Sequence, residues 1–98
     1  FGLKFYCRHN GSTTFESLNL TADYTILPGL DATIDFGSTS YRWKDIYTSD
    51  LDLSNETKGG NSIDGTWGSY KIEEGEDDLF IINRRNGKKY KFNLTEVS

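Results

Sequence analysis

The 98-residue chain contains no methionine and only one cysteine, one histidine and one proline. Cys7 alone cannot form a disulfide within the chain. His9 has no second histidine or cysteine at metal-ligand spacing, so we expect a solvated turn residue and no metal site. Because methionine is absent, the chain as written does not begin at an initiator codon. We therefore expect a processed product or the ordered part of a longer protein, with a docking segment on its N-terminal side.

An excess of basic residues is also lacking. The formal net charge is -4, and no basic stripe of the kind that nucleic-acid-binding proteins carry runs along the chain. Basic residues do cluster between Arg84 and Lys91, but the tip of a hairpin explains them more simply. No long apolar run predicts a membrane span and no signal peptide is visible. We expect neither a nucleic-acid partner nor membrane insertion.

Catalytic motifs are missing as well. The sequence contains no nucleophile elbow, no P-loop and no dinucleotide fingerprint. The 15 acidic residues include no pair singled out for acid–base chemistry. The acidic run Glu73–Asp78 lacks the spacing of a calcium loop and is typical of a solvated turn, with cation binding left open as an alternative. We expect no enzyme, no cofactor and no metal site.

What the chain does contain is aromatic residues, 14% of the total, although only 35% of its residues are hydrophobic. A disordered chain has far fewer aromatic residues. A chain of this length buries only about 60–65% of its unfolded surface, so one copy has a thin core. Many large apolar residues beside a thin core indicate burial between copies, and hence an oligomer.

Alternating apolar and polar residues predict short antiparallel strands along most of the chain. Asn10-Gly11 predicts a turn between the first two strands, and Pro28-Gly29 ends the third. The stretch from Ser54 to Gly65 predicts a loop. Strands are expected at 1–7, 13–20, 24–27, 34–36, 51–53, 67–72, 79–85 and 88–94.

The Asn86-Gly87 pair is the strongest hairpin signal in the chain. A two-residue type I′ turn there pairs Arg85 with Lys88 and Ile81 with Phe92. This pairing places an apolar set on one face of the hairpin and a mixed set on the other, as burial of one face requires. The apolar set is Leu79, Ile81, Tyr90, Phe92 and Leu94.

The stretch "GSTSYRWKDIYTSD", residues 37–50, differs from its surroundings. Trp43, Ile46 and Tyr47 follow helical spacing over a single turn, which predicts one short helical turn with these side chains packed inward. A stacking platform for sugars is the alternative, with Tyr41, Trp43, Tyr47, Trp67 and Tyr70 as its candidate residues.

The fold class predicted from these patterns is all-β, with short antiparallel strands and hairpins and one short helical turn. We expect two modules. Residues 1–36 form an N-terminal module of short strands, and residues 37–98 form the aromatic turn followed by a C-terminal hairpin.

The segment "FGSTSYRWKDIYTSDLDLSNE" resembles one that recurs in tail fibres, tailspikes and other appendage proteins of tailed bacteriophages. The shared pattern is a glycine, small polar residues, Arg-Trp, two further residues and Ile-Tyr. Residues 65–97 resemble the closing hairpin of such proteins, and "GLKFYCRHNG…FESLNL…YTILP" resembles another element of phage fibres. The family usually has an aliphatic residue where Phe36 stands, and no self-cleavage pair follows Val97. The matching motif residues are Gly37, Arg42, Trp43, Ile46, Tyr47 and Thr48.

The resemblance implies a virion structural protein on a tail or capsid appendage. It implies a homotrimeric β-rich fibre segment that contacts other virion proteins, with a role in assembly and in attachment to a host-cell glycan. Two alternatives stay open, which are a fibre or decoration protein on the capsid surface and a free carbohydrate-binding module.

Overall fold

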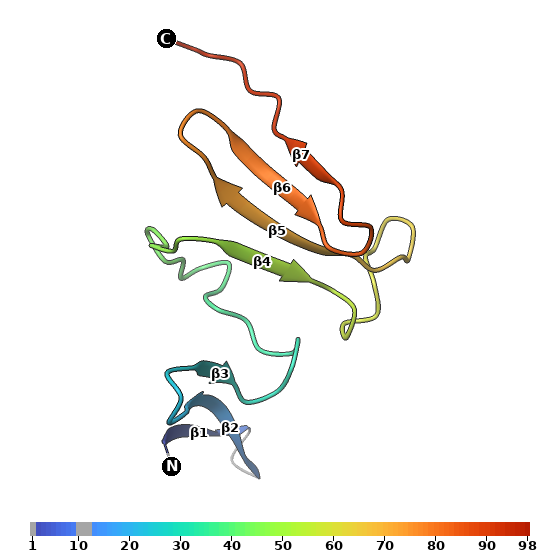
Figure 1. The fold of residues 1–98 in the computed structure, drawn as a ribbon. Coiled ribbons are helices and arrows are strands. Elements are labelled where there is room, and N and C mark those ends of the chain that lie inside the picture. Colours follow the sequence, from blue (N-terminus) through green and yellow to red (C-terminus); the bar gives the residue numbers. More distant parts are fainter. Residues whose placement is uncertain (1, 10–12) are drawn as a thin grey trace. The chain divides into compact units, whose positions relative to one another are not determined.

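The computed structural model describes the backbone of residues 2–9 and 13–98, and the side chains of these residues except 7–9, 13 and 15. The described chain is all-β, with seven strands in two antiparallel sheets (Figure 1). Its contacts divide it into two units, Phe1–Arg42 and Trp43–Ser98. The boundary falls inside the Arg-Trp motif, and the expected modules 1–36 and 37–98 stay a prediction.

The first unit holds a three-stranded sheet in the order β1-β2-β3. Its strands are β1 (Leu3–His9), β2 (Thr13–Leu20) and β3 (Ile26–Pro28). The predicted span of β2 is correct, whereas β1 and β3 begin two residues later than predicted. The predicted Asn10-Gly11 turn lies outside the described residues, as does the side chain of His9.

A bulge shifts the register of β1 against β2 between Phe5 and Tyr6. The extra residue is Ser17, whose hydroxyl donates to the carbonyl oxygen of Phe5 at 3.0 Å. The Gly29 backbone N–H donates to the carbonyl oxygen of Ser17 and so ties the end of β3 to the bulge. Cross-strand pairing places one apolar set on the same face of this sheet. The set is Leu3, Phe5, Leu18, Leu20 and Ile26.

The second unit holds a four-stranded sheet in the order β4-β5-β6-β7 (Figure 1). Its strands are β4 (Leu51–Ser54), β5 (Ser69–Glu74), β6 (Leu79–Asn83) and β7 (Lys89–Lys91). The four predicted strands of this unit are present in this order. The predicted loop 54–65 is correct except at Ser54, which ends β4. The predicted strand at 34–36 is wrong, because that stretch is irregular with bends and has no strand partner among the described residues.

The register of the second sheet separates its two faces. One row across the sheet is Leu51, Ile72, Ile81 and Tyr90, and the next row on the same face begins with Leu53 and Tyr70. The opposite face carries the row Asp52, Lys71, Ile82 and Lys89. We call the first of these the apolar face and the second the charged face. The apolar residues of the apolar face are Leu51, Leu53, Tyr70, Ile72, Leu79, Ile81 and Tyr90, and Glu74 and Asn83 lie on the same face.

The predicted helical turn is wrong, because no described residue is helical. A single turn needs burial of its apolar side, since helix nucleation is costly and few hydrogen bonds offset it. Within one copy that burial is incomplete, since Trp43 is 60% and Tyr47 is 93% exposed. The helical spacing of these aromatic residues therefore does not lead to a helical turn in the single chain.

The C-terminal hairpin has the predicted faces but not the predicted register. Ile81 pairs with Tyr90 rather than with Phe92, a shift of two residues that keeps every side chain on its predicted face. The loop spans residues 84–87, and of its Asn-Gly pair only Gly87 has positive φ, at 75°. The predicted type I′ turn, with Arg85 opposite Lys88, is therefore wrong, because type I′ needs positive φ at both residues.

Asparagine side chains explain the longer loop. The Asn83 side-chain oxygen accepts from the Arg85 backbone N–H at 3.0 Å, and the Asn86 oxygen accepts from the Lys88 N–H at 2.9 Å. The Asn83 carbonyl oxygen accepts from the Gly87 N–H at 2.8 Å. These local bonds stabilise a loop that starts at Asn83, and they compete with the tighter turn.

Candidate functional site

The motif residues are divided between the two units. Gly37, with φ of 97°, and Arg42 lie in the first unit. Beside Gly37, Ser38 and Tyr41 form a small local turn, in which the Ser38 N–H donates to the Tyr41 carbonyl oxygen at 2.9 Å and the Tyr41 N–H donates to the Ser38 hydroxyl at 3.1 Å. This turn orders the backbone next to the glycine without burying an aromatic side chain.

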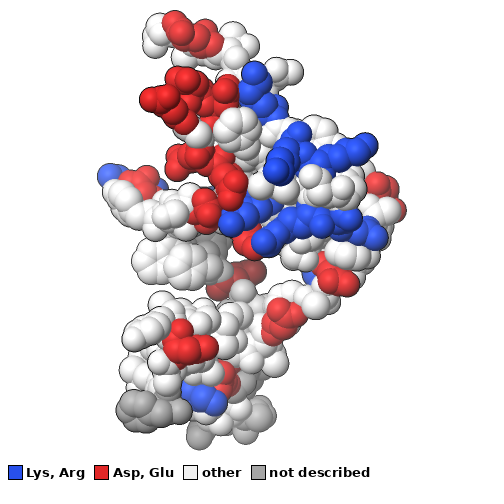
Figure 2. All heavy atoms as spheres, viewed as in Figure 1, with Lys and Arg blue, Asp and Glu red and all other residues white. Residues whose placement is uncertain are grey.

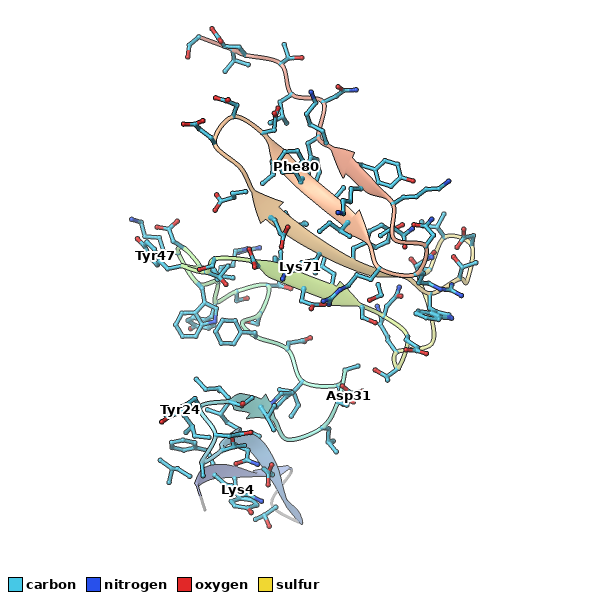
Figure 3. All side chains as sticks on the ribbon, viewed as in Figure 1. Lys4, Tyr24, Asp31, Tyr47, Lys71 and Phe80 are labelled. Carbon is cyan, nitrogen blue, oxygen red and sulfur yellow. The ribbon has the colours of Figure 1, made fainter. Side chains whose placement is uncertain are left out.

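The remaining motif residues belong to the second unit. Trp43, Ile46 and Tyr47 lie in the irregular segment before β4, and Ile46 is 69% exposed. Figure 3 labels Tyr47 in this segment. Asn86 and Gly87 lie in the loop between β6 and β7. The motif residues thus lie in both units, and the role of Trp43 as a packing residue rather than a ligand platform stays a prediction.

The most extensive feature of the second unit is its apolar face. Leu51, Leu53 and Tyr90 are each exposed by 45–49% in the single chain. No strand packs on this face from within the sheet's own unit, and no described side chain anywhere in the chain is buried in a core. The first unit has the same character, since Leu3 and Phe5 on its apolar face are about half exposed. Such faces are candidate interfaces.

The charged face of the second unit is organised by ion pairs across its strands. The Lys71 ammonium lies 3.3 Å from the Asp50 carboxylate and 3.4 Å from that of Glu73. Both carboxylates raise the pKa of Lys71, with Asp50 contributing more. Arg84, directly after β6, pairs with Asp52 of β4. This pattern is typical of a solvent-facing surface, where ion pairs set orientation more than stability.

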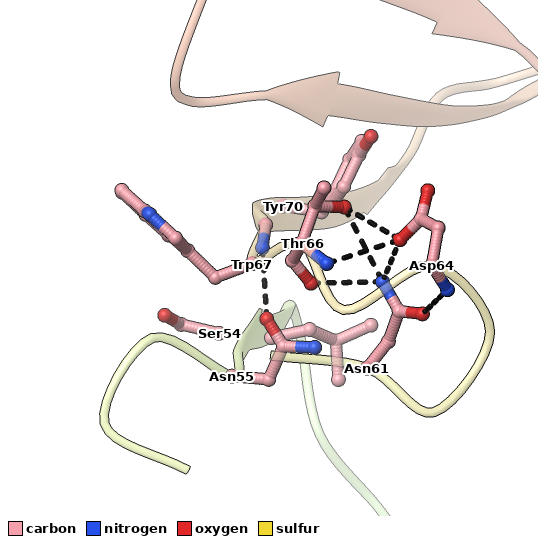
Figure 4. A pocket seen from close by; sticks show the side chains of 9 residues that line it. Ser54, Asn55, Asn61, Asp64, Thr66, Trp67 and Tyr70 are labelled. Atoms are coloured by element: carbon pink, nitrogen blue, oxygen red, sulfur yellow. Dashed lines mark hydrogen bonds between the residues drawn. The ribbon is translucent and has the colours of Figure 1, made fainter. Parts of the chain in front are cut away.

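The loop from Asn55 to Gly68 is held by its own polar groups. The Gly68 N–H donates to the Asn55 side-chain oxygen at 2.8 Å. The Asn61 side chain forms hydrogen bonds with several groups across the loop. The Asn61 side-chain NH₂ donates to Asp64 Oδ1 and to the Thr66 carbonyl oxygen, both at 2.8 Å. Its side-chain oxygen accepts the N–H groups of Ile63 and Asp64 (Figure 4).

Asp64 receives hydrogen bonds from three groups on one oxygen. They come from the Thr66 backbone N–H at 3.1 Å, from the Asn61 amide and from the Thr66 hydroxyl at 2.8 Å. These bonds favour the charged carboxylate, with the Thr66 backbone bond contributing most, and they lower the pKa of Asp64. The charge of Asp64 is therefore part of the loop's structure.

A hollow of about 520 Å³ lies between this loop and the end of the apolar face. Figure 4 shows the Trp67 indole on one side of the hollow and the Asp64 carboxylate on the other. The Arg85 guanidinium stacks on the Trp67 ring at 3.7 Å and donates to the Trp67 carbonyl oxygen at 3.0 Å. The lining residues are Leu53, Ser54, Asn55, Asn61, Asp64, Thr66, Trp67, Gly68 and Tyr70.

The hollow brings together only two of the five aromatic residues proposed as a sugar platform. Trp67 and Tyr70 line it, whereas Trp43 and Tyr47 of the same unit do not. One face of Trp67 is covered by Arg85, and the Asn61 amide is used within the loop. The arrangement is better suited to holding the loop on the sheet than to exchanging hydrogen bonds with a ligand.

The acidic run 73–78 covers the last two residues of β5 and the loop 75–78 between β5 and β6. The Gly75 N–H closes this loop by donating to the Asp78 carbonyl oxygen at 2.8 Å. Figure 2 shows Asp and Glu gathered there, with Lys and Arg gathered over the rest of the unit. Across residues 2–9 and 13–98 no group of three His, Cys, Asp or Glu side chains could hold a metal ion. Cation binding by this run stays untested.

Sequence reasoning missed the ion pairs of the charged face and the polar network of the loop. The ion pairs depend on the register of β4 against β5 and of β5 against β6, which the sequence does not reveal directly. The network had a local signal, since Asn61, Asp64 and Thr66 are residue types that bond to nearby backbone groups in turns.

Comparison with protein-family models, with curated proteins and with solved structures finds no match for this chain. Among the residues that the structure describes, no helix is long and apolar enough to span a membrane.

Proposed function

We propose that this chain is a segment of a homotrimeric virion structural protein, on a tail fibre, tailspike or similar appendage of a tailed bacteriophage. Its role is structural, in assembly with other virion proteins and in attachment to the host. The three resembling segments support the setting. The exposed apolar faces of both sheets support the oligomer.

The apolar face of the second unit is the observation that carries the proposal. Covering a large aliphatic or aromatic side chain contributes roughly 1.5–3 kcal/mol. Leu51, Leu53 and Tyr90 gain only part of this in a single copy, because they are about half exposed. Association of copies through these faces supplies the core that one thin sheet lacks, and two- or three-layer packing is what stable domains need.

The test is the mass of the complex and its place in the particle. We expect light scattering to give a trimer for the 98-residue chain, and an antibody against it to label an appendage in electron micrographs of the virion. A trimer that is never found on a particle would support the assembly and contradict the virion setting.

A location on the capsid surface, as a fibre or decoration protein, is the nearest alternative, because the same fold can be attached at either place. The antibody label distinguishes the two. Label at the tail supports the leading proposal, and label spread over the head supports the alternative.

A free carbohydrate-binding module is the second alternative, favoured by Trp67 and Tyr70 in the hollow. This reading predicts a monomer whose glycan binding is lost on Trp67→Ala. A matched Trp43→Ala variant, which changes an indole outside the hollow, should then bind normally.

A further inference from the structure

The second sheet ends in two strands that each have one unpaired edge. β4 pairs only with β5, and β7 pairs only with β6, among the described residues. An exposed strand edge presents free backbone N–H and C=O groups and is a template for another strand. What flanks these two edges decides which strand can bind there.

The backbone hydrogen bonds determine which residues turn their backbone groups toward the open edges. Lys88 and Phe92, which flank β7, bond inward to the β6 side, so by alternation Lys89 and Lys91 present their backbone groups to the open edge. Directly after β4, the Asn55 N–H bonds inward to Gly68. The backbone groups of Asp52 and, just before the strand, Asp50 therefore face the open edge.

The two edges carry opposite charges on the same face of the sheet. Lys89 and Lys91 form no ion pair with any described residue. Asp50 and Asp52 each use one carboxylate oxygen on a cation of their own copy, and their side chains are 45% and 58% exposed. A lysine-flanked edge disfavours most strands, but an acidic strand offsets that repulsion.

We propose that β7 of one copy pairs antiparallel with β4 of the next, with Lys89 opposite Asp52 and Lys91 opposite Asp50. The proposal rests on the oligomer of the proposed function and specifies how its copies join. In this register Tyr90 lies opposite Leu51 of the neighbouring copy, so the apolar faces join into one surface.

Because the sheet has four strands, copies joined in this way can close into a ring. Four antiparallel strands leave β4 and β7 running in opposite directions. Copies related by rotation about an axis along the strands keep β4 in one direction, so each junction is antiparallel. A heterologous contact of this kind closes into a ring when the rotation permits, and three copies make the trimer.

A designed disulfide tests the register in the full 98-residue chain. The variant carries Leu51→Cys and Tyr90→Cys with Cys7→Ser. Opposed residues of an antiparallel pair lie within disulfide reach, whereas the two sites in one copy are three strand spacings apart, about 14 Å. The matched control keeps Leu51 and carries Leu53→Cys in its place, together with Tyr90→Cys and Cys7→Ser. This moves the thiol about 7 Å along the strand.

We expect oxidation to give covalent dimers and trimers with the Leu51–Tyr90 pair, and at least tenfold less product with the control. Equal yields, or no product from a chain that light scattering shows to be trimeric, would overturn this pairing and leave the proposed oligomer standing. A monomeric wild-type chain would overturn the oligomer and the pairing together.

Charge reversal at the edge gives a second test. Lys89→Glu with Lys91→Glu removes no ion pair of the single chain but places acidic residues opposite Asp52 and Asp50. We expect the complex to dissociate at a concentration on the order of 10-fold higher or more. The control, Lys44→Glu with Lys58→Glu, makes the same change in net charge outside the two edge strands, and the Lys44 side chain is 96% exposed. A similar loss in both variants would contradict a specific edge contact.

Discussion

At the scale of single residues, a side chain added at Gly59 would meet backbone strain alone, whereas one added at Gly60 would also meet a steric clash. Their φ angles are 103° and 100°, a region that L side chains rarely adopt. An added Cβ at Gly59 meets open space, whereas at Gly60 it lies 2.4 Å from the Gly65 carbonyl oxygen. Gly60 also bonds through its N–H to the Asn55 carbonyl oxygen. The loop therefore depends on the second glycine more than on the first.

The first prediction uses this pair. We expect Gly59→Ala to lower the free energy of unfolding by roughly 1–2 kcal/mol, from the φ angle alone. Gly60→Ala should cost clearly more, because the loop must also shift away from the added methyl group. Urea unfolding of both variants measures the difference. Equal losses would mean that the loop yields freely at Gly65.

The second prediction concerns pH and Asp64. Its pKa is lowered below the usual 3.8 by hydrogen bonds in the folded loop. The stabilisation is therefore present above pH 3.8 and is lost as the pH falls through the lower folded value. An NMR titration should show the Thr66 amide shifting below pH 3.8 in the wild type and staying unchanged in Asp64→Asn. A midpoint at or above 3.8 would contradict the hydrogen-bonded carboxylate.

At the scale of elements, alternation in the sequence was enough to predict the faces of the sheets but not their register. Ile81 and Tyr90 were placed on one face correctly, because a shift of two residues leaves side-chain direction unchanged. The turn was missed because Asn83 and Asn86 bond to nearby backbone N–H groups, a choice that strand patterning does not encode. The helical turn failed for a different reason, since spacing alone supplies no burial.

The third prediction tests this hairpin loop. Gly87 has φ of 75° in open space, so only backbone conformation restricts the site. Gly87→Val should lower the free energy of unfolding by about 1–2 kcal/mol, whereas Gly87→Asn should cost less, because asparagine tolerates this region. Thermal unfolding of both variants provides the measurement. An equal cost for both substitutions would contradict a left-handed residue in this loop.

The fourth prediction concerns Trp43, which is 60% exposed in a single copy. We expect Trp43→Ala to weaken association between copies, because in the proposed complex the indole is covered by a neighbour. The concentration at which the complex dissociates should rise by on the order of tenfold, as for loss of a central aromatic contact. Mass photometry over a dilution series measures it.

Tyr24 provides the comparison for Trp43. It projects from the loop between β2 and β3 and is fully exposed (Figure 3). Tyr24→Ala should therefore leave dissociation unchanged. A Trp43→Ala complex as stable as this control would remove Trp43 from the interface.

At the scale of the whole molecule, both sheets have one apolar face that no strand of their own unit covers. The composition pointed to this outcome, because aromatic residues are abundant in a chain with few other apolar residues. Sequence alone could not show which residues form the open faces, since that depends on the pairing of strands far apart in the chain. The opposite charges at the two open edges, Lys89 on β7 and Asp52 on β4, likewise could not be assigned until the strand order was known.

If copies of this chain complete one another's core, the mass of the particle in solution must show it. Multi-angle light scattering on the full chain, run at several concentrations, gives that mass. We expect three times the 11.1 kDa mass of one chain, with cooperative unfolding that depends on concentration. A folded monomer of 11.1 kDa at every concentration, unfolding cooperatively at one fixed temperature, would contradict it.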